Sequence, residues 1–263
     1  MLLAAQAAHA GAWSLPEGEA LVISTTDYTV AGDGFGSDEA LNFEKTEQRL
    51  YAERGIGGRW TLVGQASFQD VLFSGLDGKS RYIGPGSVRA GARRELTRDG
   101  PERWAVQADL GYQRGGEFVT DGELIYEDVT TNLRALYGRG WARGFLDVQA
   151  GYELRFGEAP DTWQGDVSAG WDVTQRVSLL GGAFARATGG ARIGVDEIAE
   201  SRSLKLKGSV LYHRRRTSFE FGVISTVAGR NHVRDGGVTV AVWRRFGGAD
   251  KTGSAAGRVR RVG

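Results

Sequence analysis

Apolar and polar residues alternate with a period of two over many short stretches of this chain. Between Leu146 and Phe156, every second residue is apolar or aromatic, and the residues between them are polar or glycine. The same alternation runs through residues 104–113, 163–172 and 204–213. A period of two places the two sets on opposite faces of a β-strand, whereas no helical period fits these windows. The pattern therefore predicts strands with one apolar and one polar face.

Twelve stretches of this kind occur along the chain. The predicted strands are residues 20–30, 43–54, 59–72, 87–97, 103–113, 128–138, 144–156, 162–172, 176–186, 202–213, 217–226 and 237–246. The connections after odd-numbered strands are long, and those after even-numbered strands are mostly tight turns rich in glycine. An even strand count with alternating long loops and short turns is typical of outer-membrane barrels, which have long loops outside and both termini in the periplasm.

The placement of prolines and aromatic residues agrees with this interpretation. All four prolines are expected between strands, because proline cannot donate to a strand ladder; they are Pro16, Pro85, Pro101 and Pro160. Aromatic residues on the apolar faces gather near both strand ends. We expect one girdle at the tight-turn ends and one at the long-loop ends, about 25 Å apart. The girdle residues are Trp60, Trp104, Trp171 and Tyr212 at the first level, and Phe68, Tyr112, Phe156 and Trp163 at the second.

Composition excludes one class of protein. No apolar run approaches the 18 or so residues of a membrane helix, so the chain is not a helical membrane protein. Its mean hydropathy of −0.31 would suit a soluble β-sandwich. A sandwich, however, has no reason to sort its loop lengths or to place aromatics at both strand ends. The sequence therefore predicts an all-β fold, a transmembrane antiparallel up-and-down β-barrel of about 12 strands in the bacterial outer membrane.

The two chain ends lie outside this predicted barrel domain, which covers residues 11–246. Residues 1–10 resemble the remnant of a secretory signal peptide with a small-x-small cleavage site at Ala8-His9-Ala10, although a disordered alanine-rich terminus is the alternative. The last strand ends at Phe246, as in barrels that the barrel-assembly machinery recognises by an aromatic end, but Arg244 takes an outward position. Residues 247–263 are expected to form a disordered periplasmic tail.

The first 75 or so residues resemble a specific group of barrels. Gly11, Trp13, Pro16 and Gly18 open the first strand, Tyr51, Glu53 and Gly55 end the second, and Arg59-Trp60-Thr61-Leu62 opens the third. These features are similar to the outer-membrane barrels named after the meta-pathway of phenol degradation. The resemblance implies an outer-membrane location and a role in solute passage. It supplies no catalytic motif, and we transfer no substrate from it.

The polar strand faces should line the lumen. The predicted lumen residues are Lys45, Arg49, Arg89, Arg93, Asp109, Arg134, Asp147, Asp166, Lys205, Lys207 and Glu220. Because neighbouring strands carry opposite charges, cross-strand pairs are expected, in particular Arg134 with Asp147 and Arg93 with Asp109. Two functions remain open: a narrow channel for passive passage of small solutes through a charged lumen, or a structural or partner-binding barrel whose interior is closed by salt bridges.

Enzymatic chemistry has little support in the sequence. His232 with Ser225, or His213 with Ser209, are the only pairs that suggest a lipid hydrolase, and no nucleophile motif accompanies them. Asp33 with the nearby Asp38 and Glu39 resembles an acidic loop more than a cation site. We therefore predict no catalytic residues, no metal and no cofactor. The expected partners are outer-membrane lipid, the assembly machinery and small solutes, and nucleic acid is not among them.

Overall fold

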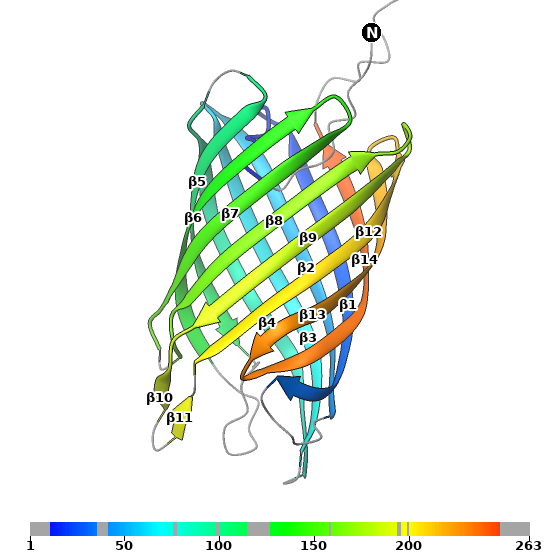
Figure 1. The fold of residues 1–263 in the computed structure, drawn as a ribbon. Helices are drawn as coiled ribbons and strands as arrows, with labels where there is room; N and C mark the ends of the chain where they lie inside the picture. The colour runs from blue at the N-terminus through cyan, green and yellow to red at the C-terminus, as the bar shows by residue number, and fades with distance from the viewer. Residues whose placement is uncertain are drawn as a thin grey trace, which may run out of the picture.

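The described part of the chain is a closed β-barrel (Figure 1). The computed structural model describes residues 11–35, 42–75, 78–97, 100–114, 127–157, 159–193, 196–198 and 200–247. These residues form twelve antiparallel barrel strands and one small two-stranded hairpin, β10–β11. Each barrel strand pairs with the next one along the chain, and the last closes onto the first. The predicted fold class is therefore confirmed.

Each predicted strand overlaps one observed barrel strand. The barrel strands are β1 (Ala20–Phe35), β2 (Asn42–Gly57), β3 (Trp60–Gly75), β4 (Gly78–Glu95), β5 (Glu102–Arg114), β6 (Glu127–Trp141), β7 (Gly144–Arg155), β8 (Thr162–Asp172), β9 (Val177–Thr188), β12 (Ser201–Arg214), β13 (Thr217–Arg230) and β14 (His232–Phe246). The hairpin between β9 and β12 consists of β10 (Ala191–Ile193) and β11 (Asp196–Ile198). No helix in the described ranges is long and apolar enough to cross a membrane.

Two of the predicted long loops are wrong, because the strands continue through them. Residues 73–86 belong largely to the β3–β4 hairpin, and residues 227–236 belong to the β13–β14 hairpin, which turns at Asn231. Pro85 consequently lies within β4 and not between strands. It is tolerated there because it adjoins a β-bulge, where the pairing of β3 with β4 shifts between Ala66 and Phe68. The predicted loop residues 36–41 and 115–126 lie outside the described residues.

Strand alternation separates an apolar outside from a polar inside. The eight predicted girdle residues all point outward, with exposed fractions from 39% for Trp60 to 68% for Phe156. On β5, for example, the outward Leu110 is 65% exposed whereas the inward Asp109 beside it is 8% exposed. The buried residues therefore lie within the barrel, and many of them are polar.

Both ends of the barrel domain lie at one end of the barrel. Ala20 at the start of β1 pairs with Phe246 at the end of β14, and Figure 1 shows the start of β1 and the end of β14 side by side at this end. We call it the terminal end and the opposite one the hairpin end, since the β10–β11 hairpin lies there. The predicted signal remnant (1–10) lies outside the described residues, as does all of the predicted tail after Gly247.

Candidate functional site

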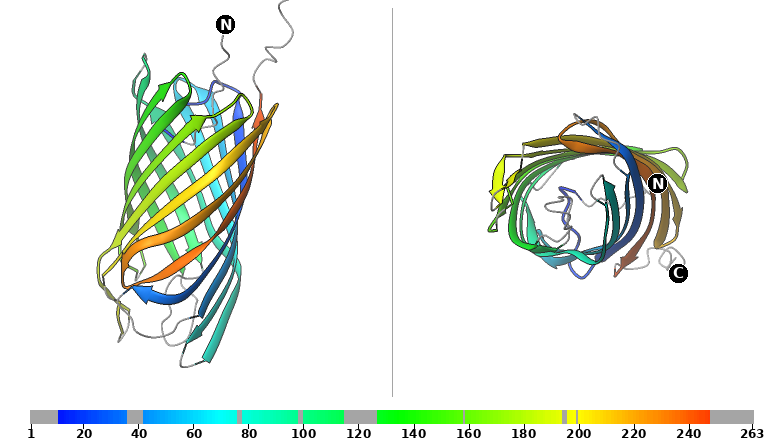
Figure 2. Two further views of the ribbon diagram at one scale, coloured as in Figure 1. Left: turned by 45° about the vertical axis from the view of Figure 1, so that its right-hand side comes forward. Right: turned by 90° about the horizontal axis from the view of Figure 1, so that it is seen from below.

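The segment before β1 folds back into the barrel. Residues 11–19, which we call the strap, leave β1 through a turn in which the Glu19 amide donates to the Pro16 carbonyl (3.0 Å). Gly18 has a φ of +79°, which the third position of a type II turn requires and which glycine adopts without steric cost. A view along the barrel axis shows the first described residues, in dark blue, inside the bore (Figure 2). The turn thus sends the strap inward and not away from the barrel.

Hydrogen bonds fix the strap to the inner wall. Among the described residues, five of them join its backbone or side chains to β3, β4, β7 and the turn before β3. They run from Leu15 N to Thr61 Oγ1 (3.1 Å), from Ser14 Oγ to Arg59 O (2.8 Å), from Ser14 N to Glu95 Oε2 (2.9 Å), from Arg93 Nη2 to Trp13 O (3.1 Å) and from Ala12 N to Asp147 Oδ2 (3.0 Å). Since β7 is halfway round the twelve-strand ring from β1, the strap reaches the opposite side of the barrel.

Small residues on the wall make room for the strap. Ala12 is fully buried against Ala105 and Leu136. The indole of Trp13 lies directly on Gly138, where an added Cβ would come within 2.6 Å of the ring. Any larger residue at position 138 would therefore displace the indole. The strap and this part of the wall are complementary in shape as well as in hydrogen bonding.

Beside the strap, the barrel contains a buried ion pair. Arg93 on β4 and Glu53 on β2 lie 2.8 Å apart across β3, and their side chains are 1% and 0% exposed. The same guanidinium donates to the Trp13 carbonyl. Tyr51 donates to Glu53 through its hydroxyl group. The Arg93 guanidinium thus binds both Glu53 and the strap.

Further along the bore the wall is a network of ion pairs. Arg89 on β4 reaches Glu153 on β7 at 2.5 Å, and Arg155 binds the same carboxylate at 2.8 Å. Asp166 on β8 accepts from both Arg134 (3.4 Å) and Arg186 (2.6 Å). These ion pairs stiffen the wall, and each carboxylate offsets the positive charge of the arginines that it binds.

The eleven predicted lumen residues all occupy inward positions of their strands. Every predicted cation has a carboxylate within 4 Å. The pairs not yet described are Lys45–Glu47 (3.1 Å), Arg49–Asp27 (2.9 Å), Lys205–Asp235 (2.8 Å) and Lys207–Glu220 (2.8 Å). Asp109 and Asp147 instead accept hydrogen bonds from Gln107 (3.2 Å) and from the strap.

The predicted partners of two arginines are wrong. Arg134 pairs with Asp166 and not with Asp147, and Arg93 pairs with Glu53 and not with Asp109. Both arginines reach across an intervening strand. Arg134 extends over Gly151, where an added Cβ would lie 2.9 Å from its side chain. Glycines on the inner wall therefore let long side chains pass their nearest neighbours, which strand adjacency alone does not reveal.

The histidines do not form the pairs considered from the sequence. The imidazole of His213 is hydrogen-bonded to Ser178 (2.8 Å) and Ser218 (3.0 Å), whereas Ser209 donates to Glu220 (2.7 Å). His232 lies in β14 and not in a loop. In the ranges that the structure covers, no group of histidine and acidic residues is arranged to hold a metal ion.

Solved structures share this fold. An outer membrane channel from Pseudomonas putida F1 superposes with a TM-score of 0.71 at 14% identity, covering 92% of this chain and 100% of that one. The translocator domain of autotransporter NalP from Neisseria meningitidis (12% identity, 88% and 90% covered) and the NanC porin (7% identity, 85% and 98% covered) each give 0.57. The sequence matches no protein-family model, and no curated protein is similar to it. These likenesses show that the chain has the fold of outer-membrane β-barrels.

Proposed function

We propose that this barrel is a narrow channel for passive passage of small solutes and that the strap closes its terminal end. The observation that carries the proposal is the position of residues 11–19 inside the bore, bound from β1 round to β7. We further propose that the terminal end faces the periplasm, because outer-membrane barrels keep their short turns and termini on that side. In this orientation the strap blocks the exit into the periplasm.

The energetics of the strap favour a closure that can open. Each hydrogen bond contributes about 0.5–1.5 kcal/mol net. Ordering each residue of the strap costs about 1–2 kcal/mol in backbone entropy. Ordering nine residues therefore costs more than the hydrogen bonds alone return, and the apolar contacts of Ala12 and Leu15 supply part of the remainder. Release of the strap breaks no pairing between barrel strands, so it costs less than unfolding a strand. Its release exposes a wall that is polar except for the small apolar patch of Ala105 and Leu136.

One observation favours the second candidate function, a structural barrel without transport. Every predicted lumen cation is paired with a carboxylate, which is the arrangement expected in a permanently closed interior. The two functions differ in what happens after the strap is removed. A channel then conducts steadily, whereas an interior closed by its ion pairs stays shut.

Planar-bilayer recordings of three variants test the proposal. The first lacks residues 11–17. The second, Gly138→Ala, places a methyl group within 2.6 Å of the Trp13 ring, so the ring has to move off this part of the wall. The matched control is Gly140→Ala on the same strand, whose methyl group would lie 4.0 Å from the same ring, an ordinary contact. We expect small, brief openings for the unmodified barrel and for the control, and steady, larger conductance for the other two.

Two results would contradict the proposal in different ways. Equal conductance of all the proteins would mean that the strap closes nothing. Absence of conductance in all of them, with the barrels folded, would leave the salt-bridged structural barrel as the better account.

We also propose a family, a passive mode of passage and a role for the last strand. Membership of the barrels named after the meta-pathway of phenol degradation rests on the resemblance in the first 75 or so residues, and we attach no aromatic substrate to it. We propose passive passage without catalysis or cofactor. We also propose that the last strand, ending at Phe246, is the element that the assembly machinery recognises; its ring lies 5.3 Å from the guanidinium of Arg244.

A further inference from the structure

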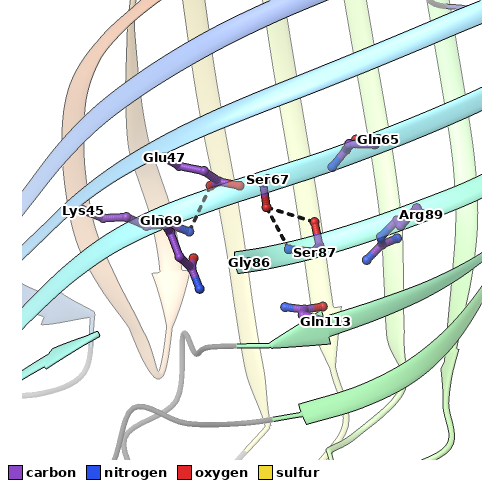
Figure 3. A pocket seen from close by; sticks show the side chains of 9 residues that line it. All are labelled: Lys45, Glu47, Gln65, Ser67, Gln69, Gly86, Ser87, Arg89 and Gln113. Carbon is purple, nitrogen blue, oxygen red and sulfur yellow. Dashed lines mark hydrogen bonds and ion pairs between the residues drawn. The ribbon is translucent and has the colours of Figure 1, made fainter. Parts of the chain in front are cut away.

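A polar recess opens in the inner wall beyond the strap, on strands β2 to β5 (Figure 3). Its volume is about 120 Å³, space for about four water molecules. The lining side chains are amides, hydroxyls and three charged groups, and none is apolar. They belong to Lys45, Glu47, Gln65, Ser67, Gln69, Ser87, Arg89 and Gln113, and the backbone of Gly86 completes the wall.

A β-bulge creates this recess. Ser67 on β3 faces two residues of β4, Gly86 and Ser87, where the pairing of the two strands shifts by one residue. Ser67 binds both the hydroxyl group (3.1 Å) and the backbone amide (2.9 Å) of Ser87, which fixes the bulge. A Cβ on Gly86 would lie 2.6 Å from the Ser67 hydroxyl oxygen. The hollow thus depends on a residue without a side chain, and bulges commonly redirect side chains in this way.

The charged groups of the recess are already neutralised. Lys45 is 3.1 Å from Glu47, and Arg89 is 2.5 Å from Glu153, which lies behind the recess on β7. An incoming anion would therefore compete with carboxylates that are in place. A charged solute gains little here.

Two amides, in contrast, point into the recess without a partner. The side-chain amides of Gln65 and Gln113 form no hydrogen bond with any residue that the structure describes, whereas the Gln69 amide donates to the Arg114 carbonyl (3.2 Å). Each free amide offers two donors and one acceptor. A ligand that matches them must carry donors and acceptors at closely spaced positions, as vicinal hydroxyl groups do.

We propose that this recess binds neutral polyhydroxylated solutes, accommodating a run of three or four hydroxyl-bearing carbons. The recess would then be a binding step on the passage, and in this respect the inference rests on the proposed channel function. Binding itself, however, is measurable without conductance. For so small a ligand we expect millimolar affinity.

Ligand-detected NMR on the folded full-length barrel in detergent tests this proposal. The probes are erythritol, its carboxylate counterpart erythronate, and 1-butanol. The key variant replaces both free amides with an apolar side chain of similar shape, Gln65→Leu with Gln113→Leu. Because neither amide has a hydrogen bond to lose, the barrel should fold normally, which heat-modifiable gel mobility verifies. The control is Gln107→Leu, also inward on β5 but outside the recess.

We expect erythritol to bind more tightly than either other probe. The double variant should weaken erythritol binding at least tenfold, whereas Gln107→Leu should leave it unchanged. Unchanged binding in the double variant would overturn the site, and tighter binding of erythronate or 1-butanol would overturn the ligand class. If the unmodified barrel fails to bind erythritol although the barrel without the strap conducts, the recess is refuted and the channel stands. If the unmodified barrel binds erythritol although no variant conducts, the channel is refuted and the recess stands.

Discussion

Replacing Arg93 with methionine tests whether the strap keeps the Arg93–Glu53 pair dry. At 2.8 Å the two charges attract by about 6 kcal/mol at an effective dielectric constant of about 20. Methionine keeps the stem of the side chain and removes its charge. The Glu53 carboxylate, whose second oxygen already lacks a partner in the described structure, is then left buried and uncompensated. Breaking a buried pair in this way costs about 3–5 kcal/mol.

Unfolding in urea, followed by tryptophan fluorescence in lipid vesicles, measures this cost. The matched control is Arg139→Met, which breaks the exposed pair of Arg139 with Glu102 (3.7 Å, side chains 58% and 49% exposed). The loss there should be under about 1 kcal/mol. Adding Glu53→Gln to Arg93→Met should recover part of the stability, because the isolated charge is gone.

The strap supplies a second comparison. In a barrel lacking residues 11–17, water reaches the pair, so the cost of Arg93→Met should fall toward that of the exposed control. An equal cost of about 1 kcal/mol for Arg93→Met and Arg139→Met in the full-length barrel would refute the reasoning, since it would show that water reaches Arg93 in the presence of the strap.

Three other predictions concern topology and assembly. Ala108→Arg, which faces outward, should destabilise the barrel by about 2–4 kcal/mol more than Gln107→Arg, which faces inward; equal unfolding free energies would mean that the face assignment is wrong. Protease added to intact cells should cut within residues 187–202 and spare residues 97–103, and the reverse pattern would show an inverted barrel. Phe246→Ala should lower the amount of barrel inserted in the outer membrane while leaving folding of the purified chain in detergent intact, whereas normal insertion in cells would remove the last strand from recognition.

Much of the fold follows from the alternation of residues, because a strand between lipid and lumen needs opposite chemistry on its two faces. The predictions are wrong where the alternation of apolar and polar residues is weak. In residues 73–86, glycines and Pro85 indicated a loop, yet β3 and β4 pair through this region. Pairing supplies the backbone hydrogen bonds there, and the β-bulge absorbs the irregular residues.

The site was less predictable than the fold. Inward charges such as Arg93 and Arg134 were identified by position, but their partners were not, because glycine neighbours such as Gly151 open paths across the wall that appear only in three dimensions. The sequence pattern places Gly11, Trp13, Pro16 and Gly18 at the opening of the first strand and predicts no strap. A segment that pairs with no lipid-facing strand needs no alternation of apolar and polar residues, so nothing periodic marks it as a strap; the only local signal is the Pro16–Gly18 turn.

The connection of the strap to β7 also constrains how the ring can be assembled. Ala12 and Asp147 are separated by 135 residues, whereas the seam that pairs Ala20 with Phe246 needs the whole chain. An open, curled sheet of β1 to β7 already contains the five wall residues that hydrogen-bond to residues 12–15 of the strap. If the strap docks on this half-ring, the remaining strands close around an occupied interior, and no threading through a finished pore is needed. The strap would then act as an internal template for the curvature of the sheet during folding, before the barrel has closed into a channel.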